Sequence, residues 1–184
     1  MKATEELRNE HEGIKLMLRV LGAVAKEIEA GKPVPPADLD SIAEFLSVFA
    51  DRCHHGKEED HLFPSLEAAG VPRQGGPIGV MLDQHAKGRT FIADLKAGIA
   101  GLEAKRGGAA EKFVSAARGY IALLTQHIEK ENNVLFPMAA RVLGEAEDAR
   151  LVEAFGELER ERIGPGKHEE FHEMLERLSR AYLE

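Results

Sequence analysis

The chain has little of several features that mark common protein classes. Its 184 residues include no tryptophan and one cysteine, and acidic residues exceed basic ones to give a formal net charge of −8. The single cysteine, Cys53, excludes an intramolecular disulfide and favours a reducing cytoplasm as the location. An acidic chain without a basic cluster is a poor candidate for binding nucleic acid or an anionic membrane surface.

Long apolar runs and strand-like alternation are missing as well. No segment approaches the ~20 apolar residues that span a bilayer, and the polar residues 1–6 lack the apolar core of a signal peptide. No segment alternates apolar and polar residues for long enough to indicate a half-buried strand. We therefore expect neither a membrane protein nor a β-fold.

Apolar residues instead recur at helical spacing along most of the chain, between segments rich in glycine and proline. This pattern predicts helices near residues 3–30, 37–69, 77–106, 109–143, 145–160 and 166–183. Short loops join antiparallel neighbours. The predicted fold class is therefore all-α: an up-down-up-down four-helix bundle over residues 1–143, with two extra C-terminal helices in an extension over residues 144–184 that packs on the bundle.

Two segments carry the same motif of His, three residues, Glu, three residues and Leu-Phe-Pro. His54 and Glu58 begin one copy, and His127 and Glu131 begin the other. Residues four apart share one face of a helix, so each copy directs an imidazole and a carboxylate at the same point. Two such points facing each other would form a site for two metal ions.

The repeat extends beyond this motif. His11 precedes His54 by 43 residues, and His85 precedes His127 by 42. The chain thus resembles two helical hairpins, each of which supplies one histidine and then the His-x3-Glu pair. The predicted metal ligands, with no separate catalytic residue, are His11, His54, Glu58, His85, His127 and Glu131.

Four imidazoles and two carboxylates without a thiolate suit iron, manganese or zinc. Two octahedral ions need about twelve bonds. If both carboxylates bridge and an oxo or hydroxo group completes the pair, roughly two positions stay open for O2, peroxide or NO. A structural zinc site would be closed and four-coordinate. From the donor set alone, the two ions that a bridging oxygen would join can be iron, manganese or zinc.

These residues resemble the hemerythrin-like family in its HHE cation-binding branch. The resemblance covers about residues 5–140 and rests on Glu10-His11-Glu12, on residues 54–59 with the Leu-Phe-Pro that follows, on Gln84-His85 with Arg89, and on residues 127–131. It implies a four-helix bundle with a non-haem di-iron centre bridged by Glu58 and Glu131. We therefore expect two Fe ions with a bridging oxo or hydroxo group, with Mn or Zn as the alternatives. The family includes oxygen carriers, sensors and proteins that handle iron, peroxide or NO.

The chain departs from the family pattern at two points, and these departures limit which of the family's functions are expected. Oxygen-carrying members place a second histidine one turn after the third-helix histidine, where this chain has Arg89. The loss of that nitrogen ligand opens a coordination position, which weakens the case for simple oxygen carriage and leaves room for redox chemistry. The chain also begins directly with the first ligand helix, whereas the iron–sulfur repair branch carries an extra N-terminal cysteine-containing domain.

Several side chains near the motifs have more than one interpretation. The Leu-Phe-Pro register favours His54 with Glu58 over His55 with Glu59 as ligands. His61 shares the helical face of His54 and is interpreted as a hydrogen-bond donor behind the ligands, with direct ligation or core packing as alternatives. Arg89 either pairs with a bridging carboxylate or reaches the surface. For Tyr120, a hydrogen bond to a bound species and plain core packing both stay open.

For the remaining cysteine, histidines and prolines, a structural role is favoured over a functional one. Cys53 points away from the motif face and is expected to be a small core residue. His168 and His172 form a His-x3-His pair that could bind a separate metal ion, but an amphipathic helix packed on the bundle is favoured. Pro64 and Pro137 either kink their helices or end them early.

The expected function is reversible binding or redox handling of O2, peroxide or NO by a cytoplasmic di-iron protein. The alternative is an iron- or oxygen-responsive sensor that signals through its C-terminal helices. The expected partner is a small diatomic or peroxide ligand, with no nucleic acid and no membrane. The sequence does not decide whether the protein is an enzyme, and it leaves a homodimer open.

Overall fold

The computed structural model describes residues 1–184 and contains no β-strand. All six predicted helices are present, with ends that differ by at most three residues, and the predicted all-α fold class is confirmed. The elements are α1 (Lys2–Glu29), α2 (Pro36–Glu44), η1 (Phe45–His55), η2 (Glu58–Leu62), α3 (Phe63–Ala68), α4 (Pro77–Glu103), α5 (Ala109–Lys130), η3 (Glu131–Leu135), α6 (Phe136–Val142), α7 (Glu145–Arg162) and α8 (Lys167–Leu183), where η marks a π-helical segment.

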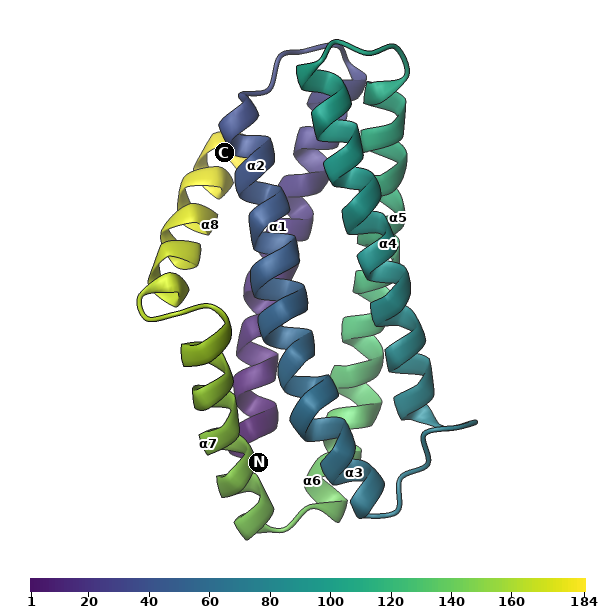
Figure 1. The fold of residues 1–184 in the computed structure, drawn as a ribbon, viewed down its shortest axis with the longest axis vertical. Coiled ribbons are helices and arrows are strands. Elements are labelled where there is room, and N and C mark those ends of the chain that lie inside the picture. The colour runs from purple at the N-terminus through teal and green to yellow at the C-terminus, as the bar shows by residue number, and fades with distance from the viewer.

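Four long helical rods form the bundle. They are α1, the continuous run from α2 to α3, α4, and the continuous run from α5 to α6 (Figure 1). α7 and α8 lie outside the bundle along one side and contact α1 (Figure 1). None of the helices combines the length and the apolar character needed to cross a bilayer.

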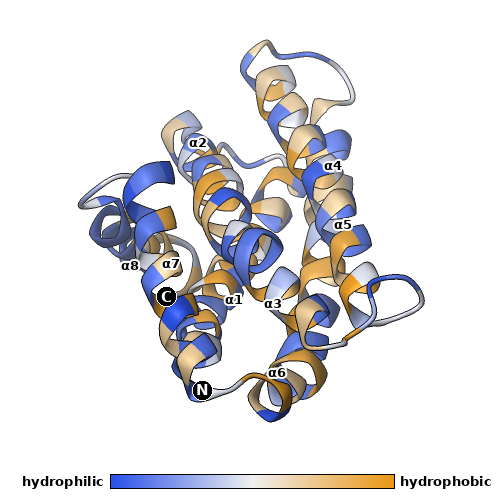
Figure 2. Cartoon of the chain, turned by 60° about the horizontal axis from the view of Figure 1, so that its bottom comes forward, coloured by the Kyte–Doolittle hydropathy of each residue, from blue (hydrophilic) through white to orange (hydrophobic).

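Apolar residues, coloured orange in Figure 2, occur on all the helices of the bundle, and the buried ones form two separate clusters. On α1, residues 14–28 contribute to the larger cluster, whereas Ala3 and Leu7 belong to the smaller one. Between them lie the buried polar residues Glu10 and His11. The other three rods repeat this order, so a layer of buried polar groups crosses the bundle between two apolar cores.

The two motif copies lie on π-helical turns. η2 and η3 each end one residue before the Phe-Pro pair, and the backbone N–H of Phe63 donates to the carbonyl of Glu58 five residues earlier. The N–H of Phe136 donates to the carbonyl of Glu131 in the same way. A proline ring clashes with the carbonyl four residues before it, and the wider turn accommodates that ring. The chain therefore stays helical through Pro64 and Pro137, and neither helix ends at the preceding phenylalanine.

The C-terminal helices attach through both apolar cores. From α7, Leu151 and Phe155 join the smaller cluster, and from α8, Phe171 and Leu178 join the larger one. The ring of Phe155 is fully buried, and the ammonium of Lys57 lies 5.5 Å from its centre. α7 is thus held to the bundle by burial of apolar surface, at a point beside the polar layer.

We expect Phe155→Ala to lower the free energy of unfolding by about 3–5 kcal/mol, because it empties a buried site that the surrounding helices only partly refill. Urea unfolding followed by circular dichroism measures this change. Glu153→Ala, an exposed position on the same helix, is the matched control and should change stability by less than about 0.5 kcal/mol. Equal stability of the two variants would contradict the assigned packing of α7.

Candidate metal centre

The structure brings the six predicted ligands together in the polar layer. Their side chains come from every rod of the bundle, and each residue is at most 1% exposed. Their donor atoms fall into two overlapping groups that share Glu58, each with ligand atoms within 4.8 Å of one another: His11, His54, Glu58 and Glu131, and His55, Glu58, His85 and His127.

The two glutamates lie between the histidines. Glu58 Oε1 is 3.6 Å from His54 Nε2, and Glu58 Oε2 is 3.4 Å from His85 Nε2. Glu131 Oε2 lies 3.2 Å from Nε2 of both His11 and His127. None of the four carboxylate oxygens has a well-formed hydrogen-bond partner, although all are buried. Each carboxylate is therefore placed to face both halves of the site.

The opposite nitrogen of each ligand histidine is held by an oxygen atom. Nδ1 lies 2.7 Å from Glu10 Oε2 in His54, 2.7 Å from Glu59 Oε1 in His85, 3.0 Å from Asn132 Oδ1 in His11, and 3.2 Å from Gln84 Oε1 in His127. A carboxylate accepts and does not donate, so Nδ1 of His54 and of His85 carries the proton. In the neutral form of these rings, the Nε2 lone pair therefore points into the site, which is the orientation that a metal ligand needs.

The inward nitrogens also face one another. His11 Nε2 lies 3.0 Å from His54 Nε2, and His85 Nε2 lies 3.2 Å from His127 Nε2. Two lone pairs at this distance repel unless a cation or a proton lies between them. Neighbouring ligands of an octahedral ion with bonds of about 2.1 Å are roughly 3 Å apart. The donor set and its spacing therefore suit a pair of metal ions.

His55 is a further member of the site that the motif register did not favour. Its ring stacks on His85 with centroids 3.9 Å apart, and its Nε2 is buried without a hydrogen-bond partner. Its Nδ1 lies 3.3 Å from Asp51 Oδ1. In an α-helix, His54 and His55 point about 100° apart. The π-helical segment η1 changes this phase, and both rings enter the polar layer.

Two other side chains lie away from the ligand cluster. Arg89 is exposed and pairs with Asp51 and Glu59, not with Glu58 or Glu131. His61 is half-buried beside Phe155 of α7, with ring centroids 6.3 Å apart. The helical phase of an ordinary α-helix predicted His61 on the ligand face, but His61 lies within the π-helical segment η2, where that phase does not apply.

Tyr120 and Cys53 are both buried. The hydroxyl of Tyr120 has no hydrogen-bond partner, and burial raises its pKa. Burying a hydroxyl without a hydrogen-bond partner costs free energy. The hydroxyl of Tyr120 is therefore free to donate a hydrogen bond to a bound species. Burial also raises the pKa of the Cys53 thiol to about 12, which keeps it protonated and unreactive as expected of a core residue.

A buried ammonium group lies behind His54. Lys57 is fully buried, and its Nζ contacts Glu10, lies 2.7 Å from Glu6 Oε1 and lies 2.5 Å from Glu159 Oε1 of α7. Burial would raise the pKa of Glu10, but the hydrogen bond and charge of His54 and the charge of Lys57 lower it to about 2. Glu10 therefore stays ionised and fixes the proton on His54 Nδ1.

The charges within the site depend on one another. Burial would lower the pKa of His85, but the close contact and charge of Glu58 and the hydrogen bond to Glu59 raise it to about 9. Burial would raise the pKa of Glu131, but its contacts with His127 and His11 lower it well below its usual value. The pKa of His55 is lowered well below its usual value by burial and by the neighbouring charge of His85. In the absence of metal, protons on some of the imidazoles balance the carboxylates.

Sequence reasoning missed the residues behind the ligands. Glu10, Glu59, Gln84 and Asn132 each lie within five residues of a predicted ligand. These residues do not always contact the histidine nearest to them in the sequence. Glu10 binds His54, and Asn132 binds His11, in both cases across the bundle. Polar side chains beside a motif are a weak signal, and only the packing of the rods assigns their partners.

Comparisons with known proteins agree with this geometry. The family described as the Hemerythrin HHE cation binding domain matches residues 2–139. Uncharacterized proteins of Mycobacterium bovis and Mycobacterium tuberculosis are 26% identical over 162 residues, which cover 88% of this chain and 63% of theirs. The chain thus spans less than two thirds of the length of these curated relatives. No solved structure gives a significant match.

We expect the metal-free protein to lose stability as the pH rises from about 6.5 to about 9. The pKa of His85 is about 9 in the folded protein and about 6.5 in an unfolded chain. Its proton therefore stabilises the fold fully below about pH 6.5, and this stabilisation is lost as the pH rises through about 9.

Urea unfolding in the presence of a chelator, repeated across this pH range, measures the effect. His85→Gln should flatten the profile, whereas His61→Gln, outside the cluster, should leave it unchanged. A free energy of unfolding that rises with pH over this range would contradict the assigned charge on His85.

Proposed function

The chain belongs to the hemerythrin HHE cation-binding domain family, and from this we propose that its bundle holds two iron ions for reversible binding or redox handling of O2, peroxide or NO. The observation that carries the proposal is the set of inward-facing imidazole Nε2 atoms and unpaired carboxylate oxygens buried together in the polar layer. Such a set binds divalent metal ions, and its mixture of imidazoles and carboxylates suits iron, with manganese or zinc as alternatives.

The two groups of donors suggest how the residues are shared. We assign His11 and His54 to one ion and His85 and His127 to the other, with Glu58 and Glu131 facing both. The four imidazoles and two bridging carboxylates leave part of the roughly twelve coordination positions of an octahedral pair open. His55 is placed to fill one more position beside His85.

The residues around the ligands have three tasks in this proposal. Glu10, Glu59, Gln84 and Asn132 keep the imidazoles in the tautomer that presents Nε2. The two apolar cores above and below the polar layer limit the entry of water and admit only small molecules. The buried hydroxyl of Tyr120 is a candidate hydrogen-bond donor to a bound ligand. The iron pair, when bound, would supply reversible electron transfer and open positions for a diatomic or peroxide ligand.

We expect two iron ions per chain in protein purified anaerobically with iron supplied, measured by elemental analysis. Glu58→Ala and Glu131→Ala each remove donor atoms from both halves of the site and should lower this content, whereas Glu12→Ala, exposed on α1, should not. The iron-loaded protein should show a near-UV band that changes on adding peroxide or NO. One zinc ion or no metal would contradict the di-iron assignment, and an unchanged spectrum would contradict the redox role.

A second candidate function is that of a sensor whose output passes through α7 and α8. One observation favours it: Glu159 of α7 binds Lys57, Lys57 binds Glu10, and Glu10 holds His54. A change at the centre could therefore alter the position of α7 through this chain of charged hydrogen bonds.

Hydrogen exchange distinguishes the two functions. In the sensor, metal binding should change amide protection over residues 145–184, without turnover of peroxide. Rapid peroxide turnover with unchanged protection of α7 and α8 would instead favour the redox enzyme. Glu159→Gln keeps an oxygen for Lys57 but removes the charge, and in a sensor it should reduce the metal-dependent change in protection.

A further inference from the structure

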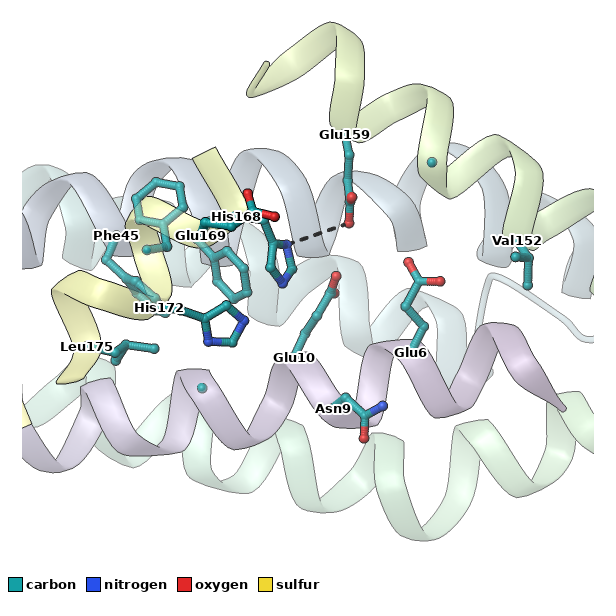
Figure 3. A pocket seen from close by; sticks show the side chains of 14 residues that line it. Glu6, Asn9, Glu10, Phe45, Val152, Glu159, His168, Glu169, His172 and Leu175 are labelled. Carbon is teal, nitrogen blue, oxygen red and sulfur yellow. Dashed lines mark ion pairs between the residues drawn. The ribbon is translucent and has the colours of Figure 1, made fainter. Parts of the chain in front are cut away.

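A second group of histidine and glutamate side chains lies outside the bundle. A cavity of about 470 Å³ separates α1 from α7 and α8, and it is lined by Glu6 and Glu10 of α1, Glu159 of α7, and His168, Glu169 and His172 of α8. Figure 3 shows the two imidazoles projecting from α8 toward Glu159 on one side and Glu10 on the other. The two histidines and Glu159 lie beyond residues 2–139, the part of the chain that the family covers.

The two histidines are arranged as a chelating pair. They are one helical turn apart on α8, which places both rings on one face, and their ring centroids are 4.9 Å apart. His168 packs edge-on against Phe49 of the bundle, with centroids 5.5 Å apart, so that its ring is held in place. Its Nδ1 is buried and has no hydrogen-bond partner.

Glu159 completes the group from the opposite wall of the cavity. His168 Nδ1 lies 4.0 Å from Glu159 Oε1, which is too long for a hydrogen bond. Neighbouring ligands of one ion are roughly 3 Å apart when its bonds are about 2 Å long, so a small rotation of either partly exposed side chain lets both atoms contact the same ion. Glu159 Oε1 also accepts from Lys57, and its second oxygen is available as a ligand atom.

The charge of the cavity favours a cation. Glu6, Glu10, Glu159 and Glu169 line it, and Lys57 is the ammonium group that three of them bind. Four carboxylates and one ammonium group leave an excess of negative charge. This excess attracts cations, because the protein walls of the cavity screen charge less than water does. Imidazole nitrogens beside a carboxylate select divalent transition metals over the hard cations Ca²⁺ and Mg²⁺.

We propose that His168, His172 and Glu159 bind one divalent transition-metal ion at this cavity, as a third site separate from the centre in the bundle. The ion would join α7 to α8 across the loop at residues 163–166 and would fix α8 over the cavity. The site does not depend on the di-iron assignment, because it shares no ligand with the bundle centre.

The test uses the full-length, metal-free chain with Zn²⁺ as the probe, and it measures bound zinc per chain by equilibrium dialysis. We expect His168→Ala/His172→Ala to bind one zinc ion fewer than the unchanged protein. His61→Ala, which removes a half-buried imidazole outside the cavity, should bind as many as the unchanged protein. His54→Ala/His127→Ala should lose zinc from the bundle but keep the ion in the cavity, so that failure of one site is distinguishable from failure of the other.

A further variant separates this three-residue site from weak binding by any His-x3-His pair on a helix surface. Even a residue that only orients a ligand costs roughly tenfold in metal affinity when it is removed. Glu159→Gln should therefore weaken zinc binding at the cavity by at least about tenfold, while it preserves a hydrogen bond to Lys57. Unchanged affinity in Glu159→Gln, or equal stoichiometry in the unchanged protein and His168→Ala/His172→Ala, would overturn the proposal.

Discussion

The burial of two carboxylates that lack hydrogen-bond donors is the constraint on which the rest of the structure depends. Glu58 and Glu131 are fully buried, and none of their four carboxylate oxygens has a well-formed hydrogen-bond partner. Buried charge of this kind is very costly unless positive charge balances it. The bundle must therefore contain either protons or metal ions at this level, and this requirement links its folding to its chemistry.

The polar layer determines how the remaining sequence is used. Two apolar clusters close the bundle above and below the layer, and they supply the burial that offsets the cost of ordering so many polar side chains. Each ligand histidine has an oxygen behind it, so the rings cannot rotate away from the centre without losing a hydrogen bond. The site is thus preorganised by the protein before any ion binds.

The C-terminal helices extend this polar network beyond the family domain. Lys57 is buried in the bundle, yet one of its three carboxylate partners is Glu159 of α7. The same glutamate faces the cavity that His168 and His172 line from α8. Charged hydrogen bonds therefore connect the bundle centre, α7 and the outer cavity in one continuous path, which gives the extension a structural connection to the metal chemistry of the core.

The sequence by itself determined the helices, the family and the convergence of the six motif residues. The periodicity of apolar residues and the duplicated His-x3-Glu spacing are patterns within single helices. They can be recognised without knowing how the helices pack against one another. Tertiary structure alone decided that His55 joins the site, that His61 leaves it, and that Glu10 and Glu159 meet at Lys57. The physical reasons are two: π-helical turns change the phase that an α-helical reading assumes, and contacts across the bundle depend on how separate helices pack.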